Sequence, residues 1–190
     1  MKIYVASSWR NNRQPEVVEF LRKKGHEVYD FKNPEPYTGF AWSEIDPNWE
    51  NWTNQEYFKA LGHPRAIQGF ESDFNAMKWA DACVLVMPCG RSAHTEAGWM
   101  QGMGKPTIVL IEDHSEPELM YKVFEHITDD LDNVNHHILF LEAKAELLEQ
   151  KALEELTTKN MNTISQFVEH FEEETGLNIP EKIVLSYFNG

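Results

Sequence analysis

The chain is poor in the residues that build several kinds of site. Only two of its 190 residues are cysteine, and neither Cys83 nor Cys89 has another Cys or a His at the spacing of metal ligands. This scarcity argues against a disulfide framework and against a zinc site, and it favours a reducing, cytoplasmic setting.

Long apolar runs and clusters of basic residues are missing as well. No run approaches the roughly 18 residues that a membrane span needs, and no charged-then-apolar leader stands at the N-terminus. Residues 1–111 hold 13 acidic and 12 basic side chains, whereas residues 112–190 hold 18 acidic and only 5 basic ones. Nucleic-acid binding needs clustered Lys and Arg, so neither a nucleic acid nor a membrane is expected as a partner.

What the sequence does contain is an alternation of short apolar runs with amphipathic stretches. Strand-like runs occur at 2–6, 26–31, 82–87 and 107–111, and helical patterns at 15–24, 69–80, 93–102 and around 118–124. This alternation predicts an α/β fold, which we expect to be a flavodoxin-like, doubly wound parallel sheet of five strands in the order 2-1-3-4-5. The α/β domain is expected to cover residues 1–134, and an acidic helical C-terminal extension residues 135–190. Within the extension, residues 164–173 are expected to be helical and residues 180–188 to form a strand or an extended arm.

Two connections have unusual compositions. The loop after the first strand reads Ser-Ser-Trp-Arg-Asn and not GxGxxG, which disfavours a standard dinucleotide-binding fold. Residues 32–64 form a long connection that is rich in tryptophan, and such length in a compact domain indicates a function. Its aromatic side chains either form a lid or stacking surface for a base, or they pack the segment onto the body of the domain.

Residues 88–107 carry most of what the sequence says about function. A polar loop follows an apolar strand and opens a helix, expected to begin at Ala93, with Glu96 in its first turn. Open α/β sheets bind ligands at the carboxyl ends of their strands, and the free N–H groups of a helix start suit anions. Glu96 is therefore the candidate nucleophile, and the helix dipole is expected to favour its ionised form.

Three motifs occur in a fixed order along the chain. They are Ile3-Tyr4-Val5-Ala6-Ser7-Ser8-Trp9, then Asp73-x-x-x-Met77-x-x-x-Asp81, and then Glu96-Ala97-Gly98. In this order and spacing, over roughly residues 1–128, the chain resembles the nucleoside 2-deoxyribosyltransferase-like family, which includes transferases and nucleotide N-glycosidases. The resemblance implies that Glu96 is the nucleophile, that Asp73 serves the departing or incoming base, and that Tyr4 orients the Glu96 carboxylate.

The chain departs from the family beside the nucleophile. Six residues before it, the nucleoside transferases have a second aspartate and the members acting on monophosphates have a phosphate-binding serine, but this chain has Gly90. Arg91 is either a surface charge or, together with Ser92 and Arg10, a ligand of a phosphate. The full set of candidate substrate-binding residues is Ser7, Ser8, Trp9, Arg10, Gly90, Arg91 and Ser92.

The chemistry that this resemblance implies needs two carboxyl groups. Breaking a nucleoside C1′–N bond passes through an oxocarbenium-like state, which one carboxylate captures while a second carboxyl exchanges a proton with the base. Burial and the charge of Glu96 are expected to raise the pKa of Asp73.

We therefore expect an enzyme without cofactor or metal that cleaves or transfers the N-glycosidic bond of a (deoxy)nucleoside or nucleoside 5′-monophosphate. A homodimer or larger homo-oligomer is expected, held by an apolar stripe in the extension. Two alternatives stay open: a nucleotide-binding sensor without turnover, which Gly90 favours, and a glycohydrolase of a dinucleotide such as NAD. The expected stripe consists of Leu139, Leu141, Leu147, Leu148 and Leu153.

Overall fold

The computed structural model describes residues 1–36, 38–111, 117–158 and 173. Contacts within the chain divide it into two units, Met1–Leu139 and Phe140–Gly190. The first unit holds a five-stranded sheet in which every pair of neighbouring strands is parallel and the order is β2-β1-β3-β4-β5. The predicted flavodoxin-like α/β fold is thus confirmed. The strands are β1 (Lys2–Ala6), β2 (Glu27–Tyr29), β3 (Ala82–Val86), β4 (Thr107–Leu110) and β5 (His126–Thr128).

The three central strands are continuous apolar runs because helices cover both of their faces. All residues of β3 and β4 are buried, as are four of the five residues of β1. The two edge strands are only three residues long. The sequence did not locate β5, since His-Ile-Thr is too short for a recognisable period of alternation.

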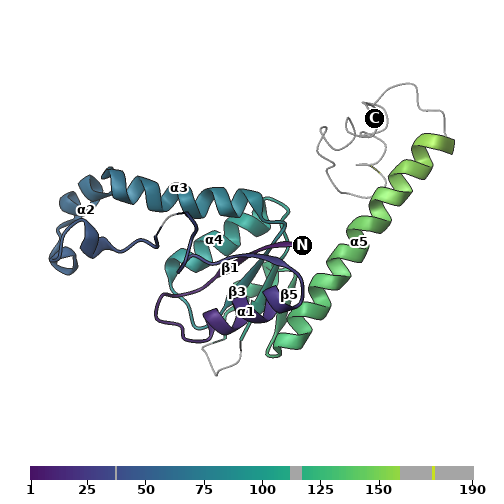
Figure 1. Ribbon diagram of the computed structural model, residues 1–190, viewed down its shortest axis with the longest axis horizontal. Coiled ribbons are helices and arrows are strands. Elements are labelled where there is room, and N and C mark those ends of the chain that lie inside the picture. Colours follow the sequence, from purple (N-terminus) through teal and green to yellow (C-terminus); the bar gives the residue numbers. More distant parts are fainter. Residues whose placement is uncertain (37, 112–116, 159–172, 174–190) are drawn as a thin grey trace. The chain divides into compact units, whose positions relative to one another are not determined.

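Helices lie on the two faces of this sheet (Figure 1). Helices α3 (Pro64–Trp79) and α4 (Arg91–Gly102) cover one face, and α1 (Gln14–Lys23) covers the other. Helix α1 has a proline in its first turn, where the missing N–H costs nothing. It is followed by Gly25 at a φ of 94°, a conformation that favours glycine. Helix α3 begins at Pro64 and so is five residues longer at its start than the sequence predicted.

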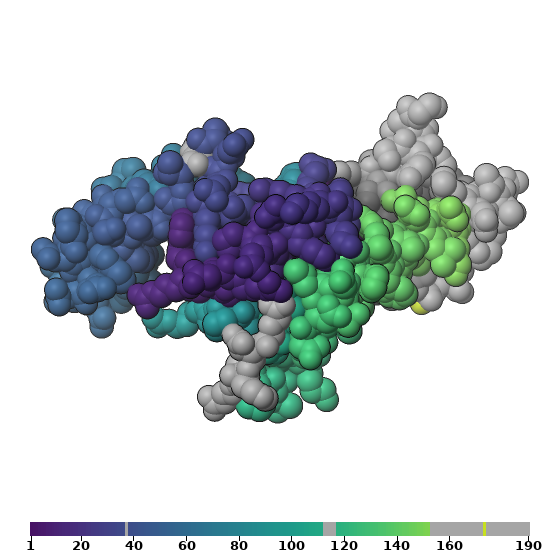
Figure 2. Space-filling view, turned by 60° about the horizontal axis from the view of Figure 1, so that its bottom comes forward, coloured from purple at the N-terminus to yellow at the C-terminus, as the bar shows by residue number. Residues whose placement is uncertain are grey.

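Part of the long connection of residues 32–64 forms short helices. It contains two 3₁₀ turns, η1 (Trp42–Glu44) and η2 (Trp49–Asn51), and the helix α2 (Asn54–Leu61). The ring of Trp42 contacts the rings of Phe40, Trp52 and Tyr57 edge-on. These aromatic side chains therefore pack on one another. Figure 2 shows this blue segment at one end of the unit, adjoining the purple N-terminal residues.

The remaining elements follow β4. The stretch predicted as a helix around 118–124 is the 3₁₀ helix η3 (Leu119–Val123), and α5 (Leu131–Thr158) begins four residues earlier than expected. Val134 and Ile138 of α5 are fully buried. No helix among the described residues is long and apolar enough to cross a membrane. The predicted helix at 164–173 and the strand or arm at 180–188 fall outside the described residues, apart from position 173.

Candidate active site

The candidate site lies where the sheet reverses its order of connection. Strands β1 and β3 are neighbours, but the chain leaves β1 toward one edge and leaves β3 toward the other. The loops that follow their carboxyl ends therefore diverge, and this is where doubly wound sheets bind ligands.

The two loops at this point are tied together by hydrogen bonds. The Ser7 hydroxyl donates to the Val86 carbonyl at 2.8 Å. The buried amide of Asn11 donates to the carbonyls of Val86 and Pro88 at 3.3 and 3.2 Å. Ser7 was predicted to bind substrate, but here its proton is engaged by the backbone. Asn11 was not predicted as a site residue.

Glu96 is carried by α4, which begins two residues earlier than the sequence predicted. Ala93, Ala97 and Met100 form the buried face of this helix, and the partly buried Glu96 lies at its border. Because α4 begins at Arg91, Glu96 belongs to the second turn and not to the first. The expected contribution of the helix dipole to its charge is therefore weaker, since that effect fades beyond the first turn.

The expectation that Glu96 favours its ionised form was wrong. Its pKa is raised to about 7, mainly because burial removes water from the charged carboxylate and further because Asp73 is a like charge. The Tyr4 hydroxyl acts in the opposite direction and stabilises the ionised form. A pKa near neutral pH, set by burial and a neighbouring charge, is typical of titratable groups at functional sites.

Asp73 on α3 is the second carboxyl of the site. The Tyr29 hydroxyl, from the end of β2, donates to its Oδ1 at 2.9 Å. Burial raises the pKa of Asp73, and the hydrogen bond from Tyr29 lowers it in part. The raised pKa agrees with the expectation for a proton-exchanging group, although burial is the main cause and not the charge of Glu96.

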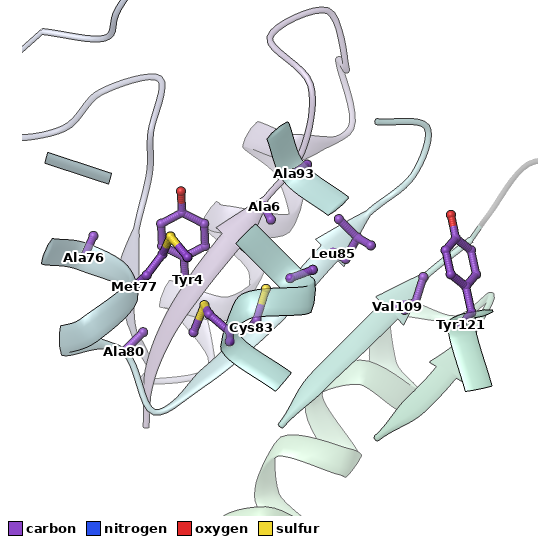
Figure 3. Packing of buried hydrophobic residues seen from close by; sticks show 12 residues of the cluster. Tyr4, Ala6, Ala76, Met77, Ala80, Cys83, Leu85, Ala93, Val109 and Tyr121 are labelled. Atoms are coloured by element: carbon purple, nitrogen blue, oxygen red, sulfur yellow. The ribbon is translucent and has the colours of Figure 1, made fainter. Parts of the chain in front are cut away.

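Tyr4 lies in the core of the sheet, near enough to both carboxyls for their charges to act on its hydroxyl. It is fully buried, and its ring is stacked on that of Tyr29 with centroids 5.4 Å apart. Figure 3 shows it beside Met77 of α3, with its hydroxyl at the outer end of the ring. Burial raises the pKa of Tyr4, and so do the charges of Glu96 and Asp73. The hydroxyl makes no hydrogen bond of regular geometry with the described residues. It remains available to a carboxylate or to a ligand.

The start of α4 presents a free, exposed helix terminus. Gly90 is its N-cap, has no side chain to cap the helix, and would meet nothing within 4 Å if it carried a Cβ. The side chains of Arg91 and Ser92 are exposed in the first turn and make no hydrogen bond with the described residues. Their positions leave the first N–H groups of α4 open to an anion.

The other predicted residues lie in the loop after β1. Trp9 is half exposed and meets Phe31 edge-on. A Cβ on Gly39 would overlap the Trp9 ring, so only glycine fits there without rearrangement. Ser8 accepts a hydrogen bond from the Arg10 backbone at 3.2 Å, and the Arg10 side chain is exposed.

Neither Tyr29 nor His94 was predicted from the sequence as a site residue. Tyr29 ends β2, and its position at the carboxyl edge of the sheet was the signal that could have found it. His94 donates from Nδ1 to the Gly90 carbonyl at 2.9 Å, and its Nε2 lies 2.8 Å from the Tyr121 hydroxyl. His94 therefore braces the start of α4 against η3. Cys83 and Cys89 are free thiols, the first buried and the second partly buried.

Among residues 1–36, 38–111, 117–158 and 173, no three side chains of the His, Cys, Asp and Glu types gather as a metal site would need. Asp81, from the second motif, lies at the other end of the sheet, where it accepts a hydrogen bond from the Lys2 backbone at 2.8 Å. Its role is structural. The structure thus brings together Tyr4, Asp73 and Glu96 from three elements, and it places the start of α4 after the neighbouring strand.

Comparisons with protein-family models and with curated proteins gave no match. Among solved structures, the chain is similar to a 2-deoxyribosyltransferase from Bacillus psychrosaccharolyticus, with 22% identity and a TM-score of 0.43 over 70% of this chain and 90% of that one. It is also similar to the CMP N-glycosidase of Clostridium botulinum, with 19% identity and a TM-score of 0.41 over 73% of this chain and 98% of that one. At these values, an assignment of function has to rest on the residues of the site.

Proposed function

We propose that the protein cleaves or transfers the N-glycosidic bond of a (deoxy)nucleoside or a nucleoside 5′-monophosphate. The observation that carries this proposal is the pair of partly buried carboxyls, Asp73 and Glu96, whose pKa values are both raised by burial, and that of Glu96 further by the charge of Asp73. Glycosyl transfer needs a pair of carboxyls, one ionised to attack the sugar and one protonated to serve the base.

In the proposed reaction, Glu96 in its ionised form attacks C1′ of the sugar. The C1′–N bond breaks, and its electron pair goes to the base, which takes a proton from Asp73. A glycosyl ester on Glu96 is left. Water or a second base then attacks C1′ and gives its proton to Asp73, and the ester bond breaks to restore the Glu96 carboxylate.

Positive charge that develops on the sugar during the reaction acts on the protonation of Glu96. A carboxylate with a pKa of about 7 is about half ionised at neutral pH in the empty site. A developing positive charge on the sugar favours the ionised form, so the interaction strengthens as the bond breaks. The protein therefore stabilises the transition state more than it stabilises the ground state.

A 5′-phosphate would be held at the start of α4. Arg91 and Ser92 are exposed there, and the open N-cap at Gly90 leaves room for a phosphate oxygen against the helix N–H groups. Arg10, from the loop after β1, is the third predicted phosphate ligand.

The test is a panel of nucleosides, nucleoside 5′-monophosphates and NAD, with free base measured by chromatography. Release of base from nucleosides or monophosphates, and its loss in Glu96→Ala, supports the proposal. The covalent step is tested with a substrate analogue fluorinated at C2′, which slows breakdown of the ester. Intact mass should rise by one glycosyl group in the native protein and not in Glu96→Ala.

The same panel discriminates the alternatives. A sensor without turnover is favoured by the missing side chain at Gly90, and it would bind nucleotide without releasing base. Release of nicotinamide from NAD alone would instead indicate a dinucleotide glycohydrolase.

We further propose that the protein acts as a homo-oligomer through an apolar face of α5. Leu139, Phe140 and Leu147 of this helix are 47, 57 and 51% exposed, an unfavourable state that a second copy would relieve. Leu141 was predicted in this face but is buried within the chain, and the side chain of Leu153 falls outside the described residues. Light scattering of Leu147→Asp should show a smaller mass than that of the native chain.

A further inference from the structure

The side chains of Ser72, Tyr29 and Asp73 form a hydrogen-bonded series that ends at the Asp73 carboxyl. The Tyr29 hydroxyl donates to Asp73 Oδ1 at 2.9 Å and lies 3.0 Å from the Ser72 hydroxyl. A phenol has one proton to give, and the carboxylate takes it, so Ser72 is the donor in the second bond. The order of donation is therefore from Ser72 to Tyr29 to Asp73.

This hydrogen-bonded series is held in place by the sheet and by ring stacking. Tyr29 is the last residue of β2 and is paired with Tyr4 in the register of the sheet. Its ring stacks on the Tyr4 ring at an interplanar angle of 14°. A phenol fixed by both its backbone and its ring presents its hydroxyl at one point, so the Asp73 oxygen that it binds is fixed as well.

The contact engages only one of the two Asp73 oxygens. Among the described residues, Oδ1 accepts from Tyr29, and no side chain or backbone N–H is bonded to Oδ2. A carboxyl that exchanges a proton with a base needs one free oxygen whose position is reproducible.

Given the proposed function, we propose that Tyr29 is the positioning residue of the site: it pins Asp73 Oδ1 and thereby leaves Oδ2 to exchange the proton with the base. Ser72 supports this role by fixing the direction in which Tyr29 donates. Tyr29 itself does not touch the substrate in this arrangement.

The ionisation of Asp73 is part of this role. A hydrogen bond donated to a carboxylate favours the charged form, so Tyr29 opposes the effect of burial on the pKa of Asp73. Titratable groups face this region from four elements, and they are Tyr4 on β1, Tyr29 on β2, Cys83 on β3 and Glu96 on α4.

The experiment compares Tyr29→Phe with the native chain and with Tyr57→Phe. The first variant keeps the ring that stacks on Tyr4 and removes only the donor. The control removes a hydroxyl from an exposed tyrosine of α2. Turnover of the substrate found in the panel is measured with KM and the pH profile, and the Asp73 carboxyl is titrated by carbon NMR.

For Tyr29→Phe we expect kcat to fall about tenfold or more while KM changes less than about twofold, because positioning is lost and substrate contacts are not. The NMR titration of Asp73 should move to higher pH by roughly one unit. Ser72→Ala should show the same changes at smaller size. Tyr57→Phe should match the native chain in all of them.

Two results would overturn the inference. Native kcat in Tyr29→Phe means that Asp73 needs no positioning by Tyr29, whether or not its titration moves. An unmoved titration of Asp73 means that the hydrogen bond does not act on it. If instead the native chain releases no base from any member of the panel, the proposed function itself fails, and with it any catalytic use of Asp73.

Discussion

Two groups of carboxylates in the Met1–Leu139 unit have opposite surroundings. In the segment before α3, Glu44 pairs with Arg65, Asp46 accepts from the Trp52 indole, and Glu56 accepts from Thr53. These contacts lower the pKa of all three carboxyls. Asp73 and Glu96 have raised pKa values because burial outweighs the hydroxyl groups that face them.

The difference shows how the same side chain serves two purposes. A carboxylate with several donors and access to water is stabilised when charged, and it helps to hold the segment in place. A buried carboxyl with one hydroxyl partner is destabilised when charged, so it holds its proton to a higher pH than an exposed carboxyl does. The first kind supports the fold, and the second kind is available for chemistry.

The largest expected effect is on turnover, which should distinguish the buried carboxyls from those in the segment before α3. Glu96→Ala should lower turnover at least about a thousandfold, because it removes the attacking carboxylate. Glu56→Gln, a change in the other group, should leave turnover within about twofold of the native value. Chromatography of the released base measures both, with circular dichroism to check the fold. Near-native turnover in Glu96→Ala would contradict the proposed mechanism.

A smaller effect concerns the cation at the start of α4. Arg91→Ala should raise KM for a 5′-monophosphate about tenfold, because a charge-assisted contact with the phosphate is lost. The unphosphorylated nucleoside is the internal control, and its KM should not change. Equal changes for both substrates would show that Arg91 acts on the fold of the loop and not on the phosphate.

The third prediction concerns how the ionisation of Glu96 makes the free energy of unfolding depend on pH. Glu96 binds its proton more tightly in the folded chain, with a pKa of about 7 against 4.5, so its contribution to stability is lost as pH rises through this interval. Glu96→Gln should therefore gain about 1–3 kcal/mol relative to the native chain between pH 5 and pH 8. Urea unfolding at the two pH values measures this gain.

For Glu56, the same measurement should show a pH dependence of stability with the opposite sign. Its pKa is lowered in the folded chain, so its contribution is present above the unfolded pKa and lost as pH falls. Glu56→Gln should be less stable than the native chain at pH 8, and the gap should close in acid. A stability difference independent of pH in both variants would mean that the two environments do not act on ionisation.

The smallest effect concerns Gly98, which lies two residues after Glu96. Gly98 lies within α4, and a Cβ added to it would meet nothing within 4 Å. Gly98→Ala should stabilise the fold by about 0.5–1 kcal/mol with turnover unchanged, because glycine is a poor helix residue. If turnover falls although stability rises, Gly98 is close to a ligand or to a second copy of the chain.

Much of the fold was predictable because its central strands are buried on both faces and so read as continuous apolar runs. The start of α4 was not, since its first residues, Arg91 and Ser92, are exposed and carry no apolar signal. Helix α2 was missed although Thr53 and Glu56 form a capping box there, which is a pattern that can be read from sequence.

The site was predictable only where it follows a motif. Tyr4, Asp73 and Glu96 were predicted through the order of three short patterns, and in the structure the charges of Asp73 and Glu96 act on Tyr4. Their catalytic roles stay predictions. Tyr29 belongs to none of these patterns, because its place in the structure comes from the pairing of β2 with β1 and from stacking on Tyr4. The pKa of Glu96 was misjudged because it depends on burial, which a local pattern does not report.

The hydrogen bonds from Asn11 to Val86 and Pro88 have a consequence for the divergence of this protein. They couple the loop that carries Trp9 and Arg10 to the loop that leads into Arg91. An insertion or a change of backbone path in one loop breaks a contact made by the other. A change of backbone path in one loop therefore has to be accommodated by the other, and relatives that differ in one path should also differ in the other.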